Sequence, residues 1–209
     1  MGIRERKQRE RERRRQQIMV AAKRVFTDKG FNKATMEDIA KEADLSPGTL
    51  YLYFKNKDEL YASLSLRILQ YLLMRLEHVT GEANLTSQQR IDALKEAMVD
   101  VYEFDPLILI NMFHLQSSES LQNLSPKLLA EIKNLSSNSL RVMADIFEEG
   151  MRSGVFIKKH PVAVADIVWA MFSGVVLWET SKKIFDEKAD YLKESLETAF
   201  DIFARGISA

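Results

Sequence analysis

The chain has 209 residues, of which 46% are hydrophobic, 8 are glycine, 4 are proline and none is cysteine. The absence of cysteine excludes disulfide frameworks, thiolate nucleophiles and zinc–thiolate sites. The 30 basic (Lys, Arg) and 30 acidic side chains cancel overall, but residues 1–60 carry a net +5 and residues 61–209 a net −5, an asymmetry typical of proteins that present one end to nucleic acid.

The N-terminal segment is dominated by charge. Residues 4–15, RERKQRERERRR, contain eight basic and three acidic side chains. One interpretation is an arm or helical extension that lies along DNA phosphates or in a flanking minor groove. The other is a solvated helix stabilised by i,i+4 pairs such as Glu5–Arg9 and Glu10–Arg14, and both can hold at once. Because the segment lacks an apolar core, we do not expect a signal peptide.

An apolar stripe at helical spacing predicts the first long helix, which ends at Gly30. The stripe consists of Ile18, Ala21, Ala22, Val25 and Phe26.

Two helix starts then follow in close succession. Thr35 can cap a helix, and Asp38 at the third helical position completes an acidic variant of the capping box. Ser46 followed by Pro47 is a second start, because proline at the first helical turn loses no hydrogen bond. Residues 43–45 leave room for a three-residue turn between them. Two short helices across such a turn are typical of a helix-turn-helix motif, whose second helix enters the major groove.

The second helix is predicted to span residues 47–54, with Leu50 and Phe54 facing inward at i and i+4. Hydroxyl and ammonium groups around it can hold phosphates, while a tyrosine ring or a threonine methyl can contact a thymine methyl. The predicted DNA contacts are Thr35, Thr49, Tyr53, Lys55 and Lys57 for the backbone, and Ser46, Pro47, Gly48 and Tyr51 near the bases. The alternative is a small helical hairpin with core tyrosines and solvated lysines.

The rest of the sequence also predicts helices. Asn56 with Glu59 predicts the start of a helix more than twenty residues long, ending near Val79. Later starts are predicted at Thr86, Pro106, Ser125-Pro126 and His160-Pro161, and a final amphipathic helix closes the chain. No sustained alternation predicts a strand. We therefore expect an all-α protein of about nine helices.

Residues 161–178 are apolar on nearly every side, and two interpretations compete. A membrane span of minimal length is one, although Asp166 interrupts it. Burial between a core and a partner subunit is the other, and we expect this one, with no membrane partner. A homodimer through the last two helices would supply the covering surface. The predicted interface residues are Ser173, Gly174, Trp178, Leu196 and Phe203.

Residues 18–60, IMVAAKRVFTDKGFNKATMEDIAKEADLSPGTLYLYFKNKDEL, resemble the N-terminal domain of TetR-family transcriptional regulators. The resembling positions are Ala21-Ala22, Val25-Phe26, Gly30, Ala34-Thr35, Ile39-Ala40, Leu45-Ser46, Gly48 to Tyr51, Tyr53-Phe54, Lys57 and Leu60. The resemblance implies a basic extension at 1–13, a three-helix DNA-binding domain at 14–75 with its motif at 35–54, and a ligand-binding and dimerisation domain at 76–209. The long helix after the motif would connect the last two.

The resemblance also implies a function. Family members are typically homodimers that bind a palindromic double-stranded DNA operator and release it when a small molecule enters the C-terminal domain. An activator, or a regulator without an effector, remains an alternative. Soft and aromatic residues suggest an apolar or aromatic effector, and the predicted pocket comprises Met74, Leu109, Met112, Phe113, His114, Met143, Phe147, Trp169 and Phe172.

Functions of other classes fit the sequence less well. His78, His114 and His160 lie far apart, and neither a glycine-rich phosphate loop nor an HExxH pair is present. We therefore expect neither an enzyme nor a bound metal or cofactor. A helical adaptor that uses the basic arm would account for the charge but not for the turn. The predicted location is the cytoplasm.

Overall fold

The computed structural model describes residues 2–116, 119–183, 185–186 and 190–209, and only the backbone of residues 3, 114–116 and 119–120. Within this part the chain forms nine α-helices and a short 3-10 helix, with no strand beyond an isolated bridge between Phe156 and Ser208. The predicted all-α fold of about nine helices is confirmed. The chain divides into two compact units, Met1–Leu66 with Leu115–Ala130, and Arg67–His114 with Glu131–Ala209.

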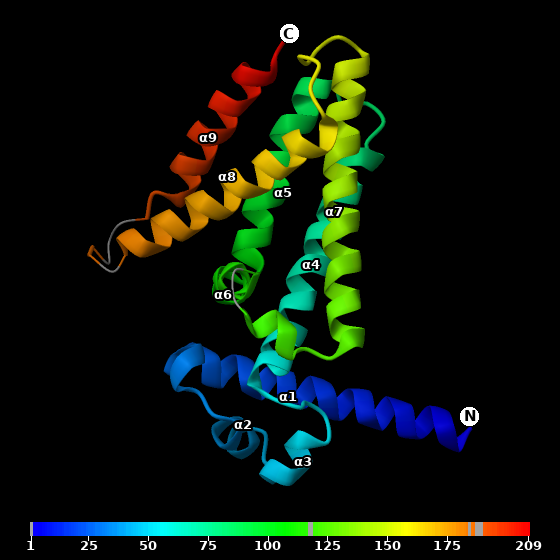
Figure 1. Cartoon of the computed structure of the whole chain (residues 1–209), viewed down its shortest axis with the longest axis vertical. Helices are drawn as coiled ribbons and strands as arrows, with labels where there is room; N and C mark the ends of the chain where they lie inside the picture. The colour runs from blue at the N-terminus through cyan, green and yellow to red at the C-terminus, as the bar shows by residue number, and fades with distance from the viewer. Residues whose placement is uncertain (1, 117–118, 184, 187–189) are drawn as a thin grey trace. The chain divides into compact units, whose positions relative to one another are not determined.

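The first unit contains the N-terminal helices (Figure 1). They are α1 (Ile3–Lys33), α2 (Met36–Glu42), α3 (Pro47–Tyr51) and the start of α4 (Lys57–Gly81), with the 3-10 helix Glu119–Asn123 and the start of α7 (Pro126–Arg152). α2 packs against α1, and α3 packs against α2. The N-terminal stretch of this unit ends at Leu66, inside α4, and the unit also takes in Leu115–Ala130. The expected domain boundary at residue 75 stays a prediction.

The α1 helix begins at Ile3, so the basic segment at residues 4–15 is part of this helix and not a separate arm. The glycine predicted to end the helix, Gly30, does interrupt it with a φ of 74° and a ψ of 158°. Upstream of this break the predicted apolar stripe is buried, with Ile18 and Ala22 fully inaccessible. Among the charged residues Glu10 pairs with Arg13 at 3.2 Å, and not with Arg14 as expected.

The second unit contains the remaining helices. They are the rest of α4, α5 (Ser87–Phe104), α6 (Pro106–Gln116), most of α7, α8 (Pro161–Lys182) and α9 (Leu192–Ile207). The predicted cap of α5 is confirmed: the Gln89 N–H donates to Thr86 Oγ1 at 3.3 Å and the Thr86 N–H donates to Gln89 Oε1 at 2.9 Å. Such caps stabilise a helix by about 1 kcal/mol.

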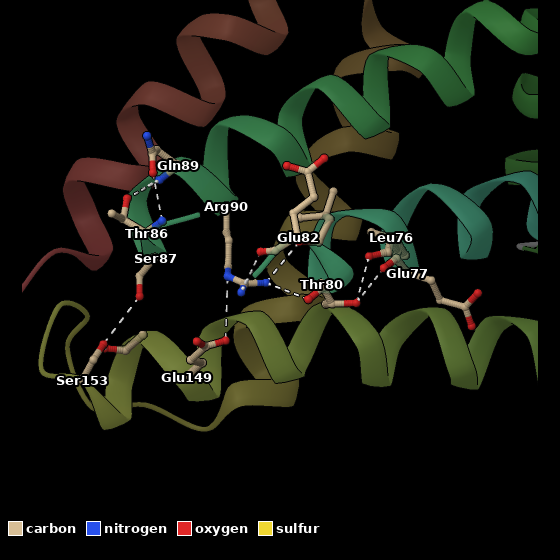
Figure 2. Close-up of polar contacts among 12 residues, drawn as sticks. Leu76, Glu77, Thr80, Glu82, Thr86, Ser87, Gln89, Arg90, Glu149 and Ser153 are labelled. Atoms are coloured by element: carbon tan, nitrogen blue, oxygen red, sulfur yellow. Dashed lines mark hydrogen bonds and ion pairs between the residues drawn. The ribbon is translucent and has the colours of Figure 1, made fainter. Parts of the chain in front are cut away.

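A buried arginine holds the C-terminal end of α4 (Figure 2). The Arg90 guanidinium, on the first turn of α5, donates to the carbonyls of Val79 and Thr80 at 3.1 Å each and to that of Glu82 at 3.3 Å. Its Nε lies 3.8 Å from a carboxylate oxygen of Glu149 on α7. The last carbonyls of a helix have no hydrogen-bond donors within the helix. Arg90 donates to two of these carbonyls in α4 and so links α4, α5 and α7.

The apolar helix α8 is only partly covered within one chain. By length and composition it could cross a membrane, with a mean hydropathy of 1.7 over an 18-residue window, of which 28% is buried. Core helices of water-soluble proteins share these properties. Its uncovered side includes Ile167 and Trp178, which are 56% and 65% exposed. Burial of α8 against its own chain is therefore incomplete.

Candidate nucleic-acid interface

The start of α2 is held by the predicted capping box. The Asp38 N–H donates to Thr35 Oγ1 at 3.1 Å, and the Thr35 N–H donates to Asp38 Oδ2 at 3.2 Å. The other carboxylate oxygen of Asp38 accepts from Lys29 Nζ at 2.7 Å, which attaches α2 to α1. Hydrogen bonds from Lys29 and Thr35 lower the pKa of the Asp38 carboxyl, outweighing its desolvation.

The turn between α2 and α3 is closed by a residue in the left-handed conformation. Asp44 has a φ of 53°, and its N–H donates to the Lys41 carbonyl while the Leu45 N–H donates to the Ala40 carbonyl. These two bonds form a Schellman motif, in which glycine is the usual residue at the left-handed position and aspartate is tolerated. Gln17 of α1 donates to the Ala43 carbonyl at 2.9 Å and fixes the turn from behind.

The α3 helix begins at Pro47, as predicted, but ends before the predicted residue. Ser46 Oγ accepts from the Thr49 N–H at 3.2 Å and lies 2.9 Å from the Thr49 hydroxyl. The predicted end at Phe54 is wrong, because the regular helix stops at Tyr51. The Leu52 and Tyr53 N–H groups donate three residues back, to Thr49 and Leu50, and this tightening ends the α-helical pattern.

The side chains of α3 and its following turn divide into an inward and an outward set. Leu50 and Phe54 are buried, as expected. Tyr51 is 48% exposed and Leu52 is 74% exposed. Sequence reasoning missed Leu52, although placing Leu50 and Phe54 inward already left positions 51 and 52 outside. Ser46, Pro47 and Gly48, at the start of the helix, are also exposed.

The residues predicted to contact the DNA backbone differ in how exposed their side chains are. Thr35 and Lys55 are exposed, whereas Tyr53 is half-buried. Lys57 is largely engaged within the protein: its ammonium donates to the carbonyls of Phe31 at 2.7 Å and Ala34 at 3.0 Å. It also lies 4.5 Å from the centre of the Phe31 ring. Lys57 therefore holds the end of α1, and its phosphate contact stays a prediction.

The aromatic members of the predicted pocket lie in two groups within the second unit. Phe113, Trp169 and Phe172 form one, with ring centres 5.5 to 6.0 Å apart. Phe147 belongs to another, 5.7 Å from the ring centre of Phe203. The other buried members are Leu109, Met112 and Met143. Met74 is 52% exposed on α4, and the side chain of His114 lies outside the described part of the chain.

Some of the predicted dimer-interface residues are exposed and others are buried within their own unit. Gly174 and Trp178 are on the uncovered side of α8, and Ser173 is half-buried beside them. Leu196 is fully buried within its own unit, so its side chain faces the core and not the outside. Phe203 is half-buried against Phe147. Ile202, which is 68% exposed, takes the outward position on α9.

Comparison with known families matches both parts of the chain. Residues 18–64 match the family described as "Bacterial regulatory proteins, tetR family", and residues 82–209 match "QacR-like protein, C-terminal region". The second match alone covers more than half of the chain. An uncharacterised HTH-type transcriptional regulator from Haemophilus influenzae is 36% identical over 108 residues, which are 52% of this chain and 56% of that protein.

Solved structures show the same fold along nearly the whole length. The TetR family transcriptional regulator PfmR from Thermus thermophilus has a TM-score of 0.71 at 22% identity, over 92% of this chain and 99% of that one. The transcriptional regulator FadR from Bacillus subtilis, solved in complex with stearoyl-CoA, has a TM-score of 0.66 at 22% identity, over 92% and 98%. The two family matches, supported by this fold and by the exposed helix-turn-helix, show that the chain belongs to the TetR family and is a DNA-binding transcriptional regulator, not an enzyme.

Proposed function

We propose that the protein is a homodimeric cytoplasmic repressor that releases a palindromic operator when an acyl-chain effector binds. The observation that carries the DNA-binding part is the outward face of α3, where Tyr51 and Leu52 are exposed on a motif that α1 braces from behind. Exposing apolar side chains of this size to water costs free energy, and a partner surface at this face would recover it. A major groove offers thymine methyls and sugar edges as that surface.

The polar groups of α3 suggest how the operator is read. Ser46 and Thr49 bond to each other and to the backbone, and Pro47 and Gly48 have no polar side-chain atom. Base discrimination therefore rests on apolar contact by Tyr51 and Leu52 and on the shape of the DNA. Thr35, Thr49, Tyr53, Lys55 and Lys57 are proposed to hold the phosphates, which fixes the register of α3 without reading sequence.

The second copy is proposed to cover α8 and α9. Ala163, Ile167, Ala170, Gly174 and Trp178 recur every three or four residues and share one helix face. Its small residues permit close approach of a second backbone, and Ile167 and Trp178 supply exposed apolar area beside Ile202 of α9. A two-fold dimer buries the same face on both subunits.

The effector is proposed to be a long-chain acyl compound such as an acyl-CoA thioester. The FadR structure with stearoyl-CoA shares this fold, and the predicted pocket residues of the second unit are almost all apolar or aromatic. Binding would release DNA through α4, whose N-terminal end lies in the unit of the motif and whose C-terminal end Arg90 holds in the other unit. A change of tilt at one end would change the separation of the two α3 helices.

The test is a gel shift of the purified protein on its own upstream DNA at moderate salt, with and without stearoyl-CoA. We expect a sequence-specific shift that weakens at least tenfold with stearoyl-CoA but not with free CoA. If neither this fragment nor a random-sequence selection gave specific binding, the DNA-reading proposal would fail. A specific shift that no acyl-CoA changed would refute the effector alone.

A further inference from the structure

The helix face that docks α1 onto the motif continues upstream as a basic stripe. At 100° per residue, Lys7 and Arg11 lie within about 20° of the buried Ile18 around the helix axis. The turns that carry Ile18 and Ala22 pack inside the first unit. The preceding turns extend past α3, as Figure 1 shows, and place lysine and arginine where the later turns place apolar residues.

This stripe and the end of α3 form the two walls of a groove. Lys7, Glu10 and Arg11 line it from α1, while Leu52 and Tyr53 line it from the turn after α3. The groove is open to solvent along its length, as a surface that receives a polymer must be.

Arg15 fixes the distance between the two walls. Its guanidinium donates to Ser63 Oγ at 2.8 Å and lies 4.4 Å from the centre of the Phe54 ring. Phe54 directly follows Tyr53 and is itself buried. The stripe therefore lies on a helix whose attachment point is one residue from the groove wall, so its backbone is already ordered before a partner binds.

The charges of the groove are available to an anion. Lys7 and Arg11 are exposed, and neither pairs with an acidic group in the described part of the chain. The carboxylate of Glu10 is held at 3.2 Å by Arg13, which offsets its repulsion of an anion. Tyr53 adds a hydroxyl donor on the opposite wall. The ammonium of Lys7 and the guanidinium of Arg11 can bind a phosphate. Across the groove, the Tyr53 hydroxyl can donate to the same phosphate and Leu52 can contact the sugar.

We propose that this groove binds the DNA backbone just outside each half-site, with Lys7 and Arg11 each neutralising one phosphate. The inference rests on the proposed DNA-reading function and extends it. DNA beyond the reach of α3 contributes affinity, and the operator that each subunit needs is longer than the bases α3 reads. Phosphate contacts add no base preference of their own.

The test compares a groove variant with a variant of equal charge change outside the stripe, on other faces of the same helix. The groove variant is Lys7→Ala with Arg11→Ala, and the control is Arg6→Ala with Arg9→Ala. Alanine favours the helix in both, and circular dichroism confirms that both remain folded. Affinity is measured against salt concentration on a selected operator with long flanks, and on the same operator trimmed to its half-sites.

We expect the groove variant to bind the long fragment at least tenfold more weakly, with a slope of log affinity on log salt about two units shallower per subunit. The control should lose less than threefold. Trimming should weaken the wild type and leave the groove variant almost unchanged, so that the two converge.

Two results would overturn the inference while leaving the DNA-reading function intact. One is an equal loss in groove variant and control, which would indicate a diffuse charge effect. The other is wild-type affinity that does not depend on the flanks. If the wild type bound no DNA specifically but its basic helix bound anionic vesicles, the inference and the proposed function would both be wrong.

Discussion

We propose that exposed apolar side chains at the end of α3 decide how the protein distinguishes one operator from another. Tyr51 and Leu52 extend outward, while the hydroxyls beside them cap the helix. A helix that reads DNA through polar side chains would leave those side chains free. We therefore expect recognition of thymine methyls and local shape, which gives smaller discrimination per base than a bidentate arginine.

Tyr51→Ala is expected to relax preference at one operator position, because it removes an apolar contact to a base edge. The expected loss is roughly 1 kcal/mol at the best sequence and little at sequences that lack the contacted base. Lys55→Ala is the control, since loss of a phosphate contact weakens all sequences alike. Affinities for a set of single-base operator variants measure both. A uniform loss for Tyr51→Ala would show that this ring holds the backbone.

Lys57→Met is expected to lower the free energy of unfolding by about 1–3 kcal/mol, because the Phe31 and Ala34 carbonyls lose a charged donor. Methionine keeps most of the apolar stem, so packing changes little. Thermal unfolding measures the loss, with Lys55→Met as the exposed control. An unchanged stability would mean that these bonds contribute nothing net and that the ammonium is free for a phosphate.

At the scale of helices, buried arginine and glutamate side chains link one helix to another. Helix propensity explains why each helix forms but not how the helices are held together. Arg90 joins α4, α5 and α7 (Figure 2), and Glu179 joins α8 to α9. Glu179 is buried, and its Oε1 accepts from Lys182 Nζ and from Ser195 Oγ at 2.7 Å each. These bonds lower the pKa of the Glu179 carboxyl despite its burial.

Arg90→Ala is expected to destabilise the protein by about 2–4 kcal/mol, since three carbonyls lose charged hydrogen bonds in a buried site. Arg90→Lys should rescue less than half of this loss, because one ammonium cannot reproduce the planar fork of a guanidinium. Chemical denaturation measures both variants. Full rescue by lysine would show that charge, and not geometry, holds the end of α4.

The Glu179 carboxylate is expected to make stability depend on pH. Because its pKa is lower in the folded state, it stabilises the protein above the unfolded-state value of about 4.3, and this contribution is lost as the pH falls through the folded-state value. Wild type should exceed Glu179→Gln in stability at pH 7, and the two should converge as the pH falls through the lowered folded-state pKa of Glu179. Parallel curves across this range would contradict the assignment.

Local signals predicted where helices begin better than where they end. The caps at Thr35, Ser46 and Thr86 are contacts within four residues, so the sequence contains them. The early end of α3 follows from the bonds that the Leu52 and Tyr53 N–H groups donate three residues back, and no cap or breaker in the sequence marks it. The inward position of Phe54 is predictable from helical period, but the contact of its ring with Arg15 from α1 is not. The burial of Leu196, a predicted interface residue, in its own unit could not be predicted either, because helical period gives a face and not the neighbour that the face meets.

At the scale of the whole molecule, the uncovered side of α8, with Ile167 and Trp178 exposed, is the apolar surface that we propose a second copy buries. We expect Ile167→Arg with Trp178→Arg to raise the dimer dissociation constant at least tenfold, because the charges remain unpaired at a two-fold interface. Sedimentation measures this, with Leu129→Arg, a 40% exposed residue on α7, as the control. An unchanged dimer would place the interface elsewhere.

Selection of bound fragments from random-sequence DNA by the purified protein tests the central claim most directly. A dimer that reads DNA with two α3 helices should enrich an inverted repeat whose half-site centres are about 10 base pairs apart, or a multiple of that spacing. The groove beside Leu52 and Tyr53 should extend the protected region beyond each half-site. Enrichment of no sequence, or of a single unrepeated site, would contradict the account.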